Sequence, residues 1–340
     1  MIARYDARGN VYAVATPAQV RDHGLALPAD PTDAARLRLS WARPAVDALC
    51  GRARGGGGPG AKPHGTDGLL VGPFQDRPPF DVLIVNTDGT LAERSGNGLT
   101  IFSRRLADCG LLGAGTSALL MVHHDQPGLA SPAITEVHAM LGLGGQPAFW
   151  LDMGAPLFGP EAVGATGSGV QPAEDGANHV ARLAGLDPSW QRSVFVRTGN
   201  PHCVTVLPDA AALPSMDALR ASSLHARLVR IAFAARSPGS VGAHGNGDPC
   251  PGGVNLQWAA LASRARITAR VFERGEGPTA SSGTSATAVA CAFWRLGLVS
   301  AGRVEVEMPG GTAPLELVEE DGQLGQVRLL GVATPCPHPG

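Results

Sequence analysis

Several residue types are scarce in this chain of 340 residues, and their scarcity excludes whole classes of protein. Lys62 is the only lysine, and it lies in a glycine- and proline-rich stretch, residues 51–65, that is typical of a loop or an insertion. Pyridoxal phosphate needs a well-placed lysine for its Schiff base, so the sequence argues against that cofactor. The formal net charge of -2 gives no basic surface that would favour nucleic acid or an anionic membrane as a partner.

Long apolar runs and paired cysteines are missing as well. No run approaches the ~18 apolar residues of a membrane helix, and the opening residues MIARYDARGNVYAV lack the apolar core of a secretory signal. We therefore expect a cytoplasmic protein. The 6 cysteines show no C-x-x-C spacing, which argues against a zinc site and a disulfide framework, so buried reduced thiols are expected. His123 and His124, followed by Asp125, are interpreted as part of a solvated loop and not as metal ligands.

What the chain does contain is a series of short runs rich in Val, Ile and Leu, separated by turn signals. Several of them alternate between apolar and polar residues, which favours half-buried antiparallel strands over a parallel doubly wound sheet. The length suits two domains of roughly 150 residues. The predicted strands are residues 11–16, 68–72, 81–86, 193–198, 203–207, 265–272, 304–308 and 327–332.

Two segments far apart in the chain resemble each other. SGNGLTIFSRRLADCGLL (95–112) and SGTSATAVACAFWRLGLV (282–299) share their length, an opening Ser-Gly, and a late glycine followed by two aliphatic residues. Each predicts one helix that ends at Gly110 or Gly297, because glycine suits a left-handed C-terminal cap. A third helix is expected over residues 177–186. Two copies of one unit indicate two similar α+β halves.

The starts of the two repeated helices are candidate binding sites. A helix N-terminus exposes unpaired backbone N–H groups and partial positive charge, and small residues let a ligand approach them. Serine is also a common N-cap, so a single Ser-Gly indicates only a cap. Here a glutamate and an arginine lie shortly before each copy: Glu93-Arg94 before Ser95, and Glu273-Arg274 before Ser282. That repetition favours a shared site in the cleft between the halves.

A series of motifs along the chain resembles the diaminopimelate epimerase family, in the same order. The resemblance implies an α+β fold of two pseudo-symmetric halves, each with a mostly antiparallel sheet wrapped around a central helix, and one site in the interdomain cleft. The halves would cover residues 1–148, completed by about 325–340, and 149–324. The motifs are ARGNVYAV near the start, GTDGLLVG (65–72), NTDGTLAERSGNG (86–98), LDMGAPLF (151–158), TGNPHCV (198–204), GGVNL (252–256) and ERGEGPTASSGT (273–284).

The resemblance also implies an activity and a set of site residues. The family inverts the α-carbon of an amino acid without a cofactor, using a base and an acid on opposite faces. The partner would be a small amino acid, with Arg274 on its second carboxylate. The sequence leaves the oligomeric state open, with a homodimer as one option. The implied catalytic positions are Ser95, Ser282, His202 and Glu273, and the implied substrate-binding positions are Asn10, Asn86, Gly96, Asn97, Asn200, Asn255, Arg274, Gly283 and Thr284.

The chain departs from the family at the centre of this site. Where the family has two cysteines, one a thiolate base and one a thiol acid, this chain has Ser95 and Ser282. A serine hydroxyl is far less acidic than a thiol and needs an adjacent base, for which His202 and Glu273 are the candidates. Pro278 stands where the family usually has Glu, Gly68 where many members have Gln, and a glycine-rich insertion occupies residues 54–64.

Three functions therefore stay open at this stage. The first is an epimerase that acts on diaminopimelate or a similar amino diacid through the serine pair. The second is an isomerase or lyase of the same superfamily that acts on another amino or hydroxy acid and needs only a weak acid, or none, on one face. The third is a relative that binds such a ligand without catalysing a reaction.

Overall fold

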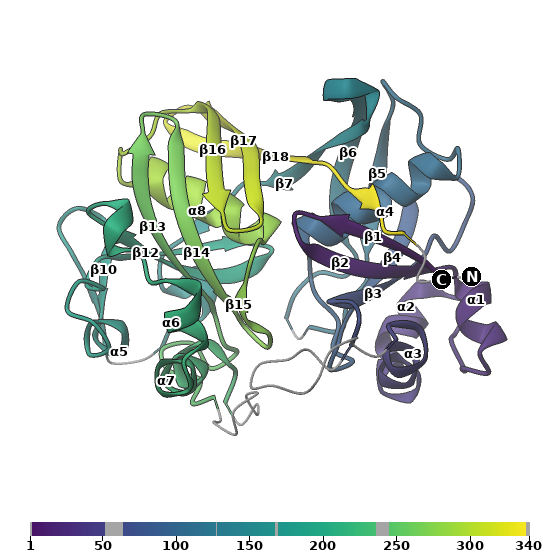
Figure 1. The fold of residues 1–340 in the computed structure, drawn as a ribbon, viewed down its shortest axis with the longest axis horizontal. Helices are drawn as coiled ribbons and strands as arrows, with labels where there is room; N and C mark the ends of the chain where they lie inside the picture. The colour runs from purple at the N-terminus through teal and green to yellow at the C-terminus, as the bar shows by residue number, and fades with distance from the viewer. Residues whose placement is uncertain (1, 52–63, 127, 167–168, 236–244, 338–340) are drawn as a thin grey trace. The chain divides into compact units, whose positions relative to one another are not determined.

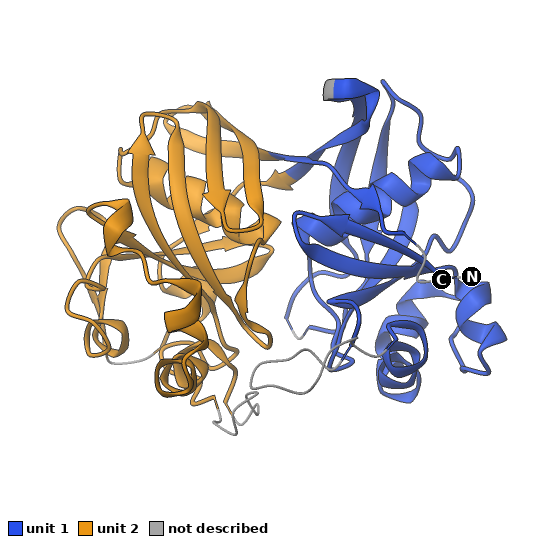
Figure 2. Cartoon of the chain, viewed as in Figure 1, with its two compact units in different colours: residues 1–152, 329–340 blue, residues 153–328 orange. Residues whose placement is uncertain are grey.

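The computed structural model describes residues 2–51, 64–126, 128–166, 169–235 and 245–337. Apart from His64, the predicted insertion at 54–64 lies outside these residues, as does Lys62. The chain divides into two compact units (Figure 2): unit 1 comprises Met1–Asp152 and Leu329–Gly340, and unit 2 comprises Met153–Arg328. No helix in the described ranges is long and apolar enough to cross a membrane.

Unit 1 is a sheet whose strand order is β19-β1-β2-β3-β4-β5-β6-β7, with α4 on one face (Figure 1). The pairs β2–β3 and β4–β5 are parallel and the others are antiparallel. Its elements are β1 (Ala3–Ala7), β2 (Asn10–Ala15), α1 (Pro17–Asp22), α2 (Pro31–Arg36), α3 (Ala42–Leu49), β3 (Gly68–Val71), β4 (Phe80–Asn86), α4 (Gly96–Asp108), β5 (Ser117–Val122), β6 (Ala133–Leu141), β7 (Pro147–Gly154) and β19 (Thr334–Pro335), with 3-10 turns at Arg38–Ser40 and Leu143–Gly145.

Unit 2 repeats this pairing pattern around α8. The strands β11, β12, β13, β14, β16 and β17 are paired in that order, with β12–β13 and β14–β16 parallel and the rest antiparallel. Its elements are β8 (Leu157–Phe158), β9 (Val170–Pro172), β10 (Asn178–Val180), α5 (Ala181–Ala184), β11 (Ser193–Thr198), β12 (Asn200–Leu207), α6 (Met216–Arg220), α7 (Ser222–Ala232), β13 (Asn255–Ser263), β14 (Arg266–Glu273), β15 (Gly277–Thr279), α8 (Gly283–Arg295), β16 (Gly302–Met308), β17 (Gly311–Glu320) and β18 (Gln323–Gly331), with 3-10 turns at Glu161–Val163 and Ala210–Ala212. The end of β18, residues 329–331, already belongs to unit 1.

The two units therefore share one topology. In unit 1, α4 follows β4 and leads to β5, which lies parallel to β4. In unit 2, α8 follows β14 and its hairpin strand β15, and leads to β16, which lies parallel to β14. The predicted α+β fold with two pseudo-symmetric halves is confirmed.

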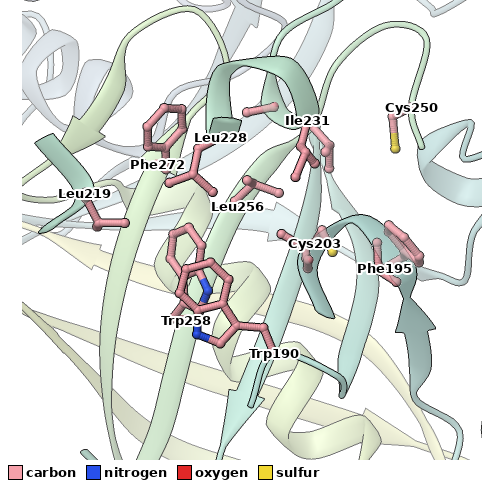
Figure 3. Packing of buried hydrophobic residues seen from close by; sticks show 14 of the residues in the cluster. Trp190, Phe195, Cys203, Leu219, Leu228, Ile231, Cys250, Leu256, Trp258 and Phe272 are labelled. Atoms are coloured by element: carbon pink, nitrogen blue, oxygen red, sulfur yellow. The ribbon is translucent and has the colours of Figure 1, made fainter. Parts of the chain in front are cut away.

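Side chains alternate between the two faces of the unit 2 sheet, and the face turned away from α8 is apolar. Leu256, Trp258 and Ala260 of β13 belong to a buried cluster under α6 and α7 (Figure 3). The rings of Trp190 and Trp258 lie 4.8 Å apart at 52°, a tilted packing that contributes ~0.5–1.5 kcal/mol beyond the area it buries. The alternate residues of β13 point to the opposite face, toward α8, because successive side chains leave a strand on opposite sides.

One predicted helix is largely wrong. Residues 178–180 form β10, which pairs with β9 and β11, and only Ala181–Ala184 is helical. The spacing of Val180 and Leu183 suits a helix, but both side chains reach the same core from a strand followed by a single turn. Tertiary pairing here overrides a local pattern that is too short to nucleate a helix.

Candidate active site

The two repeated segments form helices with matching starts. Each has 13 residues and an extended serine at its N-cap. The Oγ atom of Ser95 accepts the backbone N–H of Gly98 at 3.0 Å, and that of Ser282 accepts the N–H of Ser285 at 3.3 Å. The serine side chains therefore cap the helices, and each hydroxyl keeps its proton for a second contact.

The match extends along the first turn and to the far end. Thr100 Oγ1 donates to the carbonyl of Gly96 at 2.8 Å, and Thr287 Oγ1 donates to that of Gly283 at 2.9 Å. At the C-terminal ends, Gly110 and Gly297 have φ of 72° and 66°. The predicted glycine caps are confirmed, and the two helices correspond residue by residue.

The predicted site residues of unit 1 gather at the ends of its strands and at the start of α4. Asn10 begins β2 and is buried, and Asn86 ends β4, where its Nδ2 donates to Thr90 Oγ1 at 2.9 Å. Gly96 and Asn97 form the buried first turn of α4 directly after Ser95.

In unit 2, the strand β12 begins with Asn200 and carries His202, which is fully buried. Asn255 begins the parallel neighbour β13 in register with His202. The Asn255 Oδ1 atom accepts the backbone N–H of Arg274 at 2.7 Å, so this amide fixes the chain just after Glu273 at the end of β14. Asn255 therefore has a structural contact that the sequence does not reveal.

The arginine predicted to hold a distal carboxylate is also positioned by the backbone. Arg274 Nη1 donates to the carbonyl of Gly252 at 2.9 Å. Gly253 has φ of 77°, and a Cβ there would lie 2.7 Å from Arg274 Cδ. The glycine therefore leaves room for the arginine side chain to lie against the chain. Gly283 and Thr284 follow Ser282 in the buried first turn of α8, and Thr284 Oγ1 lies 3.4 Å from Ser282 Oγ.

In the part of the chain that is described, His202 makes no direct hydrogen bond to Ser95 or Ser282. Within the described residues, the hydroxyl of Ser282 contacts Thr284 and Ser285, while the imidazole of His202 contacts Gln257. Gln257 in turn contacts Ser285 Oγ at 3.0 Å. The link between His202 and the start of α8 thus runs through Gln257 and Ser285, two residues that sequence reasoning missed.

Burial governs the charge of His202. Desolvation, followed by the positive charges of Arg274 and Arg197, lowers the pKa of His202 to about 3. The imidazole is therefore neutral at physiological pH, with one ring nitrogen that donates and one that accepts.

Unit 1 places different residues at the positions equivalent to this polar group. Tyr12 pairs with Gly68 across β2–β3 as His202 pairs with Asn255 across β12–β13. A Cβ on Gly68 would lie 2.6 Å from the ring of Tyr12, so the ring lies over the space that a longer residue would fill. This explains why the chain has glycine here. Tyr12 is a site candidate that sequence reasoning missed.

The residues His123 and His124 are not solvated, contrary to the prediction. They are 4% and 5% exposed. His123 Nε2 lies 2.6 Å from Asp81 Oδ1, and His124 Nε2 lies 3.0 Å from the carbonyl of Ala130. Hydrogen bonds within the protein satisfy the polar atoms of both rings, which allows burial. No group of three or more His, Cys, Asp or Glu residues that could hold a metal occurs in the part of the chain that is described.

Comparison with known proteins identifies the family of this chain. The family model for diaminopimelate epimerase matches residues 239–333. A diaminopimelate epimerase from Burkholderia mallei is 30% identical over 273 residues, which cover 79% of this chain and 81% of that protein. One from Synechococcus sp. is 30% identical over 265 residues, 78% of this chain and 77% of the relative. The chain belongs to the diaminopimelate epimerase family.

Solved structures show the same fold beyond this family. A hydroxyproline epimerase from Agrobacterium vitis matches 99% of this chain and 90% of its own with a TM-score of 0.60 at 12% identity. A phenazine biosynthesis protein of the PhzF family from Bacillus anthracis matches 99% of this chain and 96% of its own with a TM-score of 0.56 at 13% identity. At such low identity these matches show the fold of this chain alone.

Proposed function

We propose that this protein is a cofactor-independent epimerase that inverts the α-carbon of diaminopimelate or a closely similar amino diacid. The observation that supports it most is the pair of matching helix starts, each a serine followed by glycine and small or polar residues in a buried first turn. The family membership of the chain supports the same substrate class. The proposal requires both helix starts to act on one α-carbon.

The first role of the helix starts is to hold the α-carboxylate. Removing an α-proton sends negative charge into that carboxylate, so backbone N–H groups aimed at it stabilise the transition state. The N–H groups of Gly96 and Asn97 in α4, and those of Gly283 and Thr284 in α8, belong to the helical turns whose amides lack intrahelical partners. The partial positive charge of each N-terminus adds to this stabilisation.

The distal end of the substrate would bind to Arg274 and the asparagines. The guanidinium presents several N–H groups in one plane, which suits a carboxylate. Asn10, Asn86, Asn200 and Asn255 supply amide groups that can both donate and accept, as an amino group and a carboxylate require. The fixed backbone of Arg274, held by Asn255, supports this role for its side chain.

Proton transfer would use Ser95 and Ser282 on opposite faces of the α-carbon. The serine that acts as the base must first lose its hydroxyl proton, for which we assign His202 or Glu273 as the acceptor. It then removes the α-proton, the electron pair moves toward the carboxylate, and the opposite serine donates its hydroxyl proton to the other face. A substrate carboxylate on Arg274 would offset part of the positive field that lowers the pKa of His202.

The test is proton NMR of the protein with diaminopimelate in deuterated water, combined with chiral analysis of the product. We expect loss of the α-proton signal together with inversion. Ser282→Ala and Ser95→Ala should each reduce inversion at least about a hundredfold, because each removes a group that moves the proton. Lysine, which lacks the second carboxylate, is the matched control and should exchange much more slowly.

Other outcomes would contradict this proposal in distinct ways. Exchange or elimination on a hydroxy acid, with none on diaminopimelate, would indicate another isomerase or lyase of the superfamily. Binding of diaminopimelate, seen as a raised Tm, without any exchange would indicate a relative that binds but does not catalyse. Full activity in both alanine variants would refute the serine pair.

A further inference from the structure

The side chain of Gln257 lies between His202 and the start of α8. Strands β12 and β13 are parallel, with His202 opposite Asn255 and Val204 opposite Gln257. Gln257 is therefore a diagonal neighbour of His202 on the face toward α8. One end of its amide lies 3.0 Å from both His202 Nδ1 and Ser285 Oγ, and all three side chains are fully buried.

The hydrogen-bond partners show which end of the Gln257 amide is the oxygen and which is the NH2 group. The other end of the Gln257 amide lies 3.3 Å from the carbonyl oxygens of Cys203 and Asn255. Carbonyl oxygens only accept, so that end is the NH2 group, and the amide oxygen faces Nδ1 and Ser285 Oγ. The amide oxygen then accepts from His202 Nδ1–H and from the hydroxyl of Ser285.

This arrangement fixes the tautomer of His202. A neutral imidazole that donates from Nδ1 carries its lone pair on Nε2. Nε2 is buried and has no hydrogen-bond partner in the described part of the chain. A buried polar atom without a partner is unfavourable, by ~1–3 kcal/mol, and in native proteins it often marks a functional group.

Unit 1 shows that the fold does not need this polar group. At the equivalent positions it has Tyr12 for His202, Leu70 for Gln257 and Gly98 for Ser285, and a Cβ on Gly98 would lie 3.5 Å from Leu70 Cδ2. At the positions of Gln257 and Ser285, unit 1 thus has an apolar side chain, Leu70, beside a glycine. The polar version in unit 2 therefore calls for an explanation other than folding.

We propose that Gln257 is a positioning residue that holds His202 as a proton acceptor at Nε2 and ties it to the first turn of α8. The role of His202 in this inference rests on the proposed function. Gln257 itself touches no reacting atom in this scheme. Gln257 excludes the tautomer of His202 in which Nε2 would donate. The hydrogen bond of Gln257 to Ser285, whose N–H is capped by Ser282, links the histidine to the start of α8.

The decisive measurement is 15N NMR of the His202 ring at neutral pH, in protein labelled at histidine and assigned with His202→Gln. We expect a protonated Nδ1 and an unprotonated Nε2 in the wild type. Gln257→Leu copies unit 1 and should fold, but it should give a mixture of tautomers. With diaminopimelate, its kcat should fall by about tenfold or more while KM changes little.

Gln257→Glu is a second variant of nearly the same shape. In place of the NH2 group it puts a carboxyl oxygen against the carbonyl oxygens of Cys203 and Asn255, which favours the protonated acid. The other oxygen still accepts from Nδ1–H, so the wild-type tautomer and most of kcat should be kept. The matched control is Ser193→Ala, which removes a buried hydrogen bond to Thr205, 3.1 Å long, from the neighbouring strand β11. It should lower stability while the ring signals of His202 stay unchanged.

The results separate this inference from the proposed function. A wild-type ring protonated at Nε2, or a tautomer unchanged in Gln257→Leu, would overturn the positioning role. Unchanged kcat in a variant with altered ring signals would overturn it too. If the wild type exchanges no amino diacid, the proposed function fails, while the ring signals still report whether Gln257 sets the tautomer of His202.

Discussion

At the scale of single residues, His202 should leave a signature in the dependence of stability on pH. Its pKa is about 3 in the folded chain, against about 6.5 when unfolded. Between these values the unfolded state binds the proton and the folded state does not. The folded state therefore gains stability from keeping His202 neutral. This gain is fully present above about pH 6.5 and is lost progressively as the pH falls toward 3.

We expect His202→Gln to flatten the acid side of the stability curve. Removing one such group lowers the slope of the unfolding free energy by up to about 1.4 kcal/mol per pH unit between about pH 4 and 6. Urea unfolding at a series of pH values measures this. Parallel curves for wild type and His202→Gln would contradict the lowered pKa.

Residue by residue, local signals were predictable from the sequence and distant ones were not. Ser282 and Gly297 mark the ends of α8 through cap chemistry that acts within one turn. Gln257 gives no such signal, because its contact with His202 depends on the register of two strands that are not joined by a hairpin. The burial of His123 is equally invisible locally, since it depends on Asp81 of another strand.

At the scale of elements, α4 packs closely against Gly331, the last residue of β18, which belongs to unit 1 as α4 does. A Cβ on Gly331 would lie 2.0 Å from Thr100 Oγ1 and 2.8 Å from Thr100 Cβ. Thr100 also donates to Gly96 in the first turn of α4. The contact therefore fixes the helix start relative to a strand that comes much later in the chain.

Gly331→Ala should destabilise the protein by about 1–3 kcal/mol, because it overpacks this contact. Thr100→Ala removes the two nearest atoms, so the double variant should recover part of the loss, with a coupling energy of at least about 0.5 kcal/mol in urea unfolding. Gly113→Ala, whose Cβ would meet only Thr116 Cγ2 at 3.8 Å, is the neutral control. Additive effects of the two changes would contradict the packing.

For whole elements, too, local signals could be predicted from the sequence and distant pairings could not. The two repeated helices and the eight predicted strands were recognisable because apolar periodicity and caps act locally. The segment 177–186 was not, because β10 exists only through its pairing with β9 and β11. The roles assigned to the site residues stay predictions, since the contacts that position them come from both local caps and distant pairing.

At the scale of the whole molecule, unit 1 is built from two separate stretches of chain, while unit 2 is continuous. Residues 329–337 complete unit 1 in several places. Strand β19 pairs with β1, and the carbonyl of Ala333 accepts from Arg104 Nη1 at 2.8 Å. Arg8 Nη2 likewise donates to the carbonyl of Leu330.

Ending the chain after Arg328 should therefore loosen unit 1 and spare the core of unit 2. The guanidinium groups of Arg104, which is buried, and Arg8, which is partly buried, would lose carbonyl partners, which is unfavourable for charged groups. Amide hydrogen exchange should accelerate in residues 2–15 and 96–108 and stay slow in 193–207 and 255–273. Ending the chain after Cys336 keeps these contacts and is the control. Equal acceleration in both units would contradict the division.

The divided layout of unit 1 affects how the protein is made. Domains usually fold in the order in which they leave the ribosome. Here β1 emerges first, yet its partner β19 is translated only after all of unit 2. Unit 2 can therefore fold on the nascent chain while β1 of unit 1 still lacks its partner strand. Such an unpaired sheet edge is prone to pair with a wrong strand. A slow stage of synthesis before residue 329 would prolong that exposure.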